Sequence, residues 1–522
     1  MFSSHLNTRK RLVCGLFLLF FSAQIAAVER PNIVLIMADD VGYGDVSFYN
    51  EHVVGKKAHV HTPNIDALAA QGIWFTDAHS PSALCSTTRY SVMSGNSTYR
   101  SYAPWGVWGS FKKNAITKDD LTLGRVAKAA GYETGFVGKW HLGGSFHKKG
   151  TTTIYEGKNK GEATKIPNLK EWIAGHPREL GFDYDFTVPT GVQGPLYLAF
   201  ENSHWYPLSE KSDLLYMEKN NAEHTKIVGL QGPGMGDPAW DATRLNKLLA
   251  SKAEQFIHSN AGKTPFLLTY WSSAVHVPHL PPEKWGKETI AGTTLTRHLD
   301  MVKTLDQEVS TIVKALKATG VYENTLIVFT SDNGGIIDST AEAAGHNSPG
   351  DLRGSKGQAY EGGHRVPFIV TWPAYTAQGS QNDALVNGTD LVATIAALLA
   401  VPVKPEQAKD SWNLLPLIKG EKDAPRRHEL MLQGGVGKKH VVFRDGHWKL
   451  LIRSGNRVKR YRALALFDLS SNPQEEELGN LVENPKYQDR VKKMLKRYIK
   501  IRQSGIRTAP LNDSVPGKNK AL

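Results

Sequence analysis

The sequence predicts an α/β fold with a large, mainly parallel sheet flanked by helices, followed by a smaller C-terminal α+β domain with a short antiparallel sheet. Several short apolar, β-branched runs end in Asp, Asn, His or Gly, which is typical of buried strands in a parallel sheet. Helical stretches lie between these runs, and this alternation indicates βαβ units. After Pro416 the pattern changes to strand-like segments separated by turns such as Asp445-Gly446.

The elements follow in order along the chain. The runs predicted as strands of the large sheet are residues 32–37, 134–137, 265–271, 325–330 and 366–372. Thr62 and Pro63 mark the start of a helix over residues 64–71, and Gly72 marks its end. A longer helix is predicted over residues 293–319. In the smaller domain we expect strands at 441–444, 448–452 and 465–469 and a basic amphipathic helix near 484–503.

The first 27 residues have the pattern of a secretory signal peptide. Basic residues at 9–11 precede an apolar run at 12–21 and small residues at 22–27. The apolar run is shorter than the roughly 20 residues of a membrane-spanning helix. We therefore expect a secreted or periplasmic protein without stable membrane insertion after cleavage; an uncleaved anchor is the alternative. The predicted organisation is a signal peptide at 1–27, an α/β domain at 28–415, an α+β subdomain at 416–507 and a flexible tail at 508–522.

Composition limits the class of protein further. With 40% apolar and 22% charged residues, the chain is not collagen-like, disordered or a membrane bundle. Its two cysteines cannot build a disulfide framework or a thiolate zinc site, and without the signal peptide only Cys85 remains. The net charge of +13, of which the signal peptide carries three, favours a polyanionic partner. We expect no nucleic-acid partner, because the chain is exported and has no recognisable binding module for one.

Acidic and amide side chains directly follow two of the predicted strands. Asp39 and Asp40 come after the first strand, and Asp332 and Asn333 come after the strand at 325–330. Ligands of open parallel sheets bind at the carboxyl ends of the strands, so these side chains can converge in one crevice. Oxygen-only ligation suits Ca²⁺ or Mg²⁺. The alternative interpretation is that each pair forms only a turn or a helix cap.

The segment Cys85-Ser86-Thr87-Thr88-Arg89 resembles the C-x-P/A-x-R motif of formylglycine-dependent type I sulfatases, an arylsulfatase-like family of the alkaline phosphatase superfamily. In that family the cysteine is oxidised after synthesis to formylglycine (3-oxoalanine). Further similar segments occur in order along the chain, at 30–45, 138–143, 276–278, 331–334, 352–363, 444–449 and 466–469. The resemblance implies an alkaline-phosphatase-like fold and a sulfuric ester hydrolase. Thr87 departs from the motif, where the family has proline or alanine.

The resemblance also assigns roles to residues of this sequence. It implies a divalent cation, Ca²⁺ or else Mg²⁺, whose ligands are Asp39, Asp40, Asp332, Asn333 and the modified Cys85. One oxygen of the hydrated formylglycine would attack sulfur, and the other would expel sulfate afterwards. Arg89 would orient the modified residue, and His141 would act as a base. Lys139 and Lys356 would supply positive charge, with Lys356 or His276 protonating the leaving alcohol.

The expected substrate is a sulfated polysaccharide or its oligosaccharides, since a basic surface attracts such polyanions. Substrate contacts are predicted for Lys139, His276, Lys356, His279, His346 and the aromatic Trp105. The expected protein partner is a formylglycine-generating or anaerobic sulfatase-maturating enzyme. Two alternatives stay open here: a phosphatase or phosphonate hydrolase of the same superfamily, and a non-catalytic polyanion-binding protein in which Thr87 prevents modification of Cys85.

Overall fold

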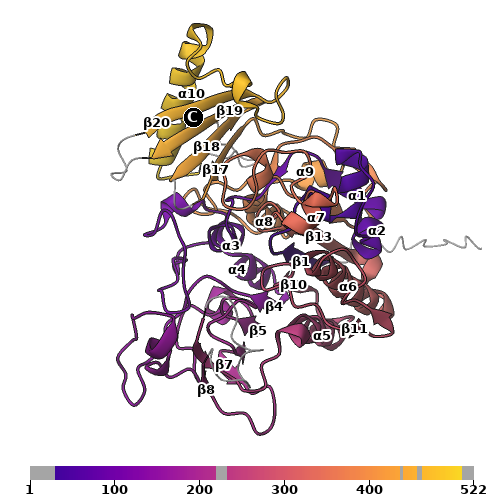
Figure 1. Cartoon of the computed structure of the whole chain (residues 1–522), viewed down its shortest axis with the longest axis vertical. Coiled ribbons are helices and arrows are strands. Elements are labelled where there is room, and N and C mark those ends of the chain that lie inside the picture. Colours follow the sequence, from indigo (N-terminus) through magenta and orange to yellow (C-terminus); the bar gives the residue numbers. More distant parts are fainter. Residues whose placement is uncertain (1–29, 219–231, 436–438, 455–460, 508–522) are drawn as a thin grey trace, which may run out of the picture.

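The computed structural model describes residues 30–218, 232–435, 439–454 and 461–507. The expected signal peptide and the expected tail both lie outside the described residues, so both stay predictions. In the described ranges, no helix combines the length and the apolar character needed to cross a bilayer. The chain forms a large α/β body with a small sheet and a helix at one end (Figure 1).

A ten-stranded sheet forms the centre of the fold. Its parallel middle consists of β13 (Thr325–Ser331), β1 (Asn32–Ala38), β10 (Phe266–Trp271), β4 (Glu133–Lys139) and β5 (Tyr184–Val188). Outside β13 lie β14 (Phe368–Thr371), β2 (Ile73–Phe75) and β15 (Ser380–Asn382), and outside β5 lie β6 (Ala199–Glu201) and β7 (His204–Tyr206). The predicted mainly parallel sheet is confirmed. The strand expected at 366–372 is present as β14, but it runs antiparallel to β13.

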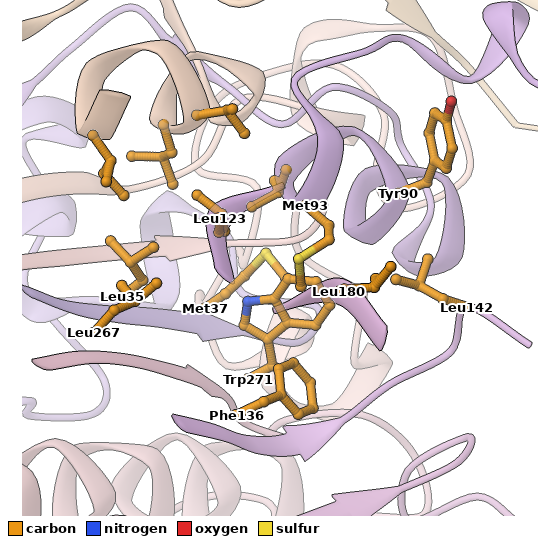
Figure 2. Packing of buried hydrophobic residues seen from close by; sticks show 14 of the residues in the cluster. Leu35, Met37, Tyr90, Met93, Leu123, Phe136, Leu142, Leu180, Leu267 and Trp271 are labelled. Carbon is orange, nitrogen blue, oxygen red and sulfur yellow. The ribbon is translucent and has the colours of Figure 1, made fainter. Parts of the chain in front are cut away.

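Helices cover both faces of this sheet. On β1, Ile33 and Leu35 point into one hydrophobic core while Val34 and Ile36 point into the other. The first core is covered by α3 (Cys85–Ser94), α4 (Leu123–Ala129) and α8 (Leu391–Leu398), and the second by α2 (Pro63–Gln71), α5 (Ala242–Asn260) and α6 (Arg297–Ala318). Figure 2 shows the first core, where Trp271 packs beside Phe136 and Met37. Because both faces are buried, these strands are apolar along nearly their whole length.

The two helices predicted in this domain are present, and the second starts later than predicted. α2 starts at Pro63 and ends directly before Gly72, the two residues that mark its ends in the sequence. α6 begins at Arg297 and not at residue 293, because Asp300 accepts hydrogen bonds from the backbone N–H groups of Gly292 (2.7 Å) and Thr294 (3.1 Å). These bonds hold residues 292–296 in a turn before the helix. The shorter elements of the α/β body are α1 (Ser47–Tyr49), β3 (Ala78–His79), β8 (Leu215–Met217), β9 (Gly234–Gly236), β11 (Lys284–Trp285), β12 (Glu288–Thr289), α7 (Ser339–Ala343), β16 (Val386–Asn387) and α9 (Leu415–Ile418).

The C-terminal part forms the predicted small antiparallel sheet. Its strands are β17 (Glu429–Gln433), β18 (His440–Asp445), β19 (Trp448–Ser454) and β20 (Tyr461–Asp468). β17 was not expected from the sequence. α10 (Gln488–Gln503) buries Met494 and Tyr498 against Phe443 of β18, as the predicted amphipathic helix should, although it starts four residues later than predicted. The division of the chain at residue 415 stays a prediction.

Candidate active site

The four predicted metal ligands that follow strands meet at the carboxyl edge of the sheet. β1 and β13 pair in parallel with Ala38 opposite Ser331, so the residues that follow both strands emerge side by side. The backbone N–H of Asp40 donates to Asp332 Oδ1 at 3.3 Å, and Asn333 Nδ2 donates to Asp40 Oδ1 at 2.9 Å. The strand register therefore brings these side chains together, as the sequence predicted from their places after the strands.

Helix α3 carries Cys85 into this cluster. Cys85 is its first residue, and its Sγ lies within 4.8 Å of ligand atoms of Asp39, Asp40 and His276. Arg89 follows one turn later and is fully buried. The positive end of the helix dipole and the arginine both favour negative charge at this point.

Arg89 joins the helix to the ends of the strands. Its Nε and Nη2 donate to Asp332 Oδ2 at 3.1 and 2.7 Å, and its Nη1 donates to the backbone oxygen of Lys139 at 2.8 Å. The guanidinium also lies 5.3 Å from the ring centre of Trp271, the indole labelled in Figure 2. With all of these partners in place, Arg89 holds Asp332 in one orientation and fixes the start of α3 relative to the sheet.

Two lysines place positive charge beside Cys85. Lys139 ends β4, is fully buried and forms an ion pair with Asp39. Lys356 Nζ lies 2.6 Å from Asp40 Oδ1. Burial, the largest single effect, raises the pKa of the Cys85 thiol, but Lys139, Lys356 and a hydrogen bond with His276 together outweigh it, and the pKa falls to about 7. The position of Cys85 is therefore one that stabilises an anion.

His276 presents one ring nitrogen to the same cluster. Its Nδ1 donates to the backbone oxygen of Val277 at 2.6 Å, which leaves Nε2 facing Asp40 Oδ2 at 3.9 Å. Burial and Lys139 oppose protonation, but Asp40 and Asp39 outweigh them, so the pKa of His276 is raised. This imidazole can therefore hold a proton at Nε2 near neutral pH.

The pKa of His141 is shifted in the opposite direction to that of His276. It follows β4, and Ser86 Oγ donates to its backbone oxygen at 2.7 Å. Burial, and after it the charges of Lys139 and Arg89, holds the pKa of His141 well below its usual range. Its Nδ1 is buried and has no hydrogen-bond partner among the described residues. A neutral imidazole in this place can accept a proton.

The donor set fits a hard divalent cation. Asp39 Oδ1 and Asn333 Oδ1 are both buried without a hydrogen-bond partner in the described part of the chain. The pKa of Asp332 is raised well above its usual range by burial and by the Asp39 charge, which shows that the carboxylates crowd one another. Buried oxygen atoms that lack partners and repelling carboxylates both call for a cation, and oxygen ligands suit Ca²⁺ or Mg²⁺.

Three predicted substrate residues lie outside this cluster. His346 Nε2 lies 3.0 Å from Asp45 Oδ1, in a separate buried group. The ring of His279 lies 5.1 Å from that of His298, and the side chain lines a cavity of about 540 Å³. Trp105 packs against the core of the C-terminal sheet. Substrate contact by these three residues stays a prediction without support from the geometry.

The structure also shows residues that the sequence did not single out. A Cβ on Gly191 would lie 2.8 Å from Lys139 Cδ and 3.0 Å from Gln193 Oε1, so both side chains surround this glycine. Gln193 Oε1 is buried and has no hydrogen-bond partner among the described residues. No motif marks this loop. Asp45 and His298 were also missed, because only tertiary packing brings them together.

The family follows from comparison with known proteins. A family model described as "Sulfatase" matches residues 31–401, which is most of the chain. The chain belongs to the sulfatase family. A second model, described as the C-terminal part of N-sulphoglucosamine sulphohydrolase, matches residues 355–504 and includes the small antiparallel sheet. The predicted family and fold class are confirmed, and the sulfatase is a sulfuric ester hydrolase.

Individual relatives agree with this assignment. The sulfatase is 31% identical to an N-acetylgalactosamine-6-O-sulfatase of Bacteroides thetaiotaomicron over 86% of this chain and 89% of the relative. It is 30% identical to human arylsulfatase A over 78% of this chain and 72% of the relative. A solved structure from work on glycosaminoglycan metabolism by Bacteroides thetaiotaomicron matches with a TM-score of 0.75 and 28% identity, and covers 91% of this chain and 100% of that one.

Proposed function

We propose that this sulfatase is exported and removes sulfate esters from sulfated glycans of the glycosaminoglycan class. The observation that carries the proposal is the placement of Cys85 near two lysines and beside the cluster of oxygen ligands. This arrangement suits a small oxyanion such as a sulfuryl group. Glycan specificity is supported by the two Bacteroides thetaiotaomicron relatives, one an N-acetylgalactosamine-6-O-sulfatase and the other from work on glycosaminoglycan metabolism.

We propose further that Cys85 is converted to formylglycine by a formylglycine-generating or anaerobic sulfatase-maturating enzyme. When formed, this residue supplies a geminal diol, in which one oxygen attacks sulfur and the second allows sulfate to be expelled. Ca²⁺, held by Asp39, Asp40, Asp332 and Asn333, would supply positive charge to the oxygens of the sulfate group. Thr87, which departs from the family motif, is fully buried, and its Oγ1 lies within hydrogen-bond distance of Ser82 Oγ (2.7 Å) and of the backbone oxygen of Leu84 (2.9 Å).

The remaining steps fall to side chains of the chain itself. Lys139 and Lys356 bind the sulfate oxygens and offset the charge that develops on them. His276, with its raised pKa, donates a proton from Nε2 to the leaving alcohol oxygen, and Lys356 is the alternative donor. His141, with its lowered pKa, accepts a proton at a ring nitrogen. One acid and one base with pKa values pushed apart are what two-step group transfer requires.

Peptide mass spectrometry over Cys85 tests the modification. We expect the mass of the aldehyde, not that of the thiol, in protein from its native host or from a host that co-expresses a maturating enzyme. Cys85→Ala should remove turnover of an aryl sulfate and leave the circular dichroism spectrum unchanged. An unmodified thiol in active protein, or a Cys85→Ala variant that keeps activity, would refute this mechanism.

A matched aryl phosphate should be hydrolysed more slowly than the sulfate by fully modified enzyme.

Sulfate release from defined oligosaccharides tests the substrate class. We expect release from sulfated glycosaminoglycan fragments, measured by ion chromatography, and Cys85→Ala protein serves as the control. Turnover of aryl sulfates without release from any glycosaminoglycan fragment would contradict the substrate and not the chemistry. Export is tested separately: N-terminal sequencing of extracellular or periplasmic protein should begin near residue 28.

A further inference from the structure

A second buried group of metal-ligand side chains lies apart from the active site. Asp45 ends a short 3-10 turn after β1, His298 lies in the first turn of α6, and His346 lies in the loop after α7. Their exposed fractions are 0, 0 and 4%. One ligand atom from each lies within 4.8 Å of the others, with His298 Nε2 at 3.1 Å and His346 Nε2 at 3.0 Å from Asp45 Oδ1.

The donor types differ from those of the active site. Two imidazole nitrogens and one carboxylate oxygen are ligands that zinc and other d-block ions prefer, whereas the active site offers mainly oxygen. In a tetrahedral site with bonds of about 2.0–2.1 Å, neighbouring ligand atoms lie about 3.3 Å apart. The two nitrogen–oxygen separations of 3.0 and 3.1 Å are close to this spacing.

A neighbouring lysine distinguishes another buried group of possible metal ligands from the group at Asp45. His79, Glu361 and His364 also form a buried cluster, but Lys449 Nζ lies 2.9 Å from Glu361 Oε1 and 3.2 Å from His364 Nε2. An ammonium group therefore already contacts the carboxylate oxygen and the imidazole nitrogen that an ion would need as ligands. Asp45, in contrast, has no lysine or arginine ion-pair partner among the described residues.

Hydrogen bonds also fix the orientation of the Asp45 carboxylate. Its Oδ2 accepts from the backbone N–H of Gly42 at 2.9 Å and from Ser348 Oγ, which leaves Oδ1 for the two histidines. Oδ1 has only the two imidazoles as partners among the described residues, and a cation beside a buried carboxylate stabilises its charge. His279 brings a third imidazole close: its ring lies 5.1 Å from that of His298, and its Nε2 is buried without a hydrogen-bond partner in the described ranges.

We propose that Asp45, His298 and His346 bind one divalent d-block ion, with zinc as the expected metal, in a buried structural site. The ion joins three segments that are far apart in sequence: the loop that carries Asp39 and Asp40, the start of α6, and the loop before Lys356. It takes no part in sulfate ester hydrolysis. Its role is to hold two loops of the active site against α6.

Metal analysis of the full mature chain, purified without a histidine tag from zinc-supplemented culture, tests the proposal. We expect about one zinc per chain by inductively coupled plasma mass spectrometry. His298→Gln and His346→Gln should each lose most of it. His258→Gln, at an exposed position on α5, and Asn333→Ala, which alters only the oxygen cluster, should keep it.

X-ray absorption at the zinc edge of the unmutated protein provides a test that does not depend on the folding of variants. Scattering from two imidazoles is the expected result. A zinc content below about 0.1 per chain, full zinc retention in both histidine variants, or a zinc shell without imidazole would each overturn the proposal.

Discussion

Lys449→Met removes a positive charge that links the C-terminal sheet to the edge of the large sheet where the proposed metal ligands lie. Lys449 lies on β19 and is fully buried, and its Nζ is 2.9 Å from Glu361 Oε1 and 2.7 Å from Glu475 Oε1. Glu361 starts a 3-10 turn whose last carbonyl, that of Gly363, accepts a hydrogen bond from Gly334 N–H at 2.9 Å. Gly334 directly follows the proposed metal ligand Asn333, so the lysine supports the active site through one short turn.

The size of the stability loss depends on the two carboxylates that remain buried after Lys449 is replaced. Removing one member of a buried ion pair costs about 3–5 kcal/mol. Glu361 keeps Arg365, whose Nη2 and Nε lie 2.5 and 2.9 Å from its Oε2, so the loss falls mainly on Glu475. Burial raises the pKa of Glu475 even with Lys449 present, and this carboxylate can take up a proton once the lysine is gone. We therefore expect the lower end of the range, about 3 kcal/mol, at pH 7 and a smaller loss at pH 5.

Denaturant unfolding at both pH values measures this loss. Lys492→Met on α10, whose lysine is 76% exposed, is the matched control and should change stability by less than about 0.5 kcal/mol. The double variant Lys449→Met/Glu475→Gln should recover part of the loss, because it no longer buries an unpaired carboxylate. A loss below about 1 kcal/mol, or a double variant as unstable as the single one, would refute the reasoning.

Three further predictions concern single substitutions. Lys139→Ala should lower kcat/KM for an aryl sulfate by about 10²–10³-fold in steady-state assays, because it removes the buried cation beside Asp39. Burial raises the pKa of Glu308 from 4.5 to about 8. The contribution of this group to the free energy of unfolding is therefore fully present below about pH 4.5 and is lost as the pH rises through 8. Glu308→Gln should therefore match the wild-type melting temperature near pH 4.5 and exceed it by about 2–4 °C at pH 9. Gly334→Ala would place a Cβ 2.0 Å from the carbonyl oxygen of Gly362, so calcium affinity measured by calorimetry should fall.

The strands could be predicted wherever burial alone determines the residue pattern. β1, β10 and β13 are covered on both faces, and their sequences are continuous apolar runs. The antiparallel direction of β14 could not be predicted, because the residues of a strand do not encode the direction of its neighbour. β17 was missed since its five residues, Glu-Leu-Met-Leu-Gln, acquire strand character only by pairing with β18.

The convergence of the proposed metal ligands was predictable for a related reason. Asp39, Asp40, Asp332 and Asn333 directly follow two strands that pair in parallel, so the topology of the sheet decides that they meet. His298 shows the limit of that reasoning. It lies at the start of an amphipathic helix, where a polar residue is usually exposed, and it is fully buried only because the 3-10 turn with Asp45 and the loop with His346 pack against that end of α6. A group of side chains that follow neighbouring parallel strands can thus be predicted from the sequence. A group whose members come from a turn, a helix and a loop can be recognised only in the tertiary structure.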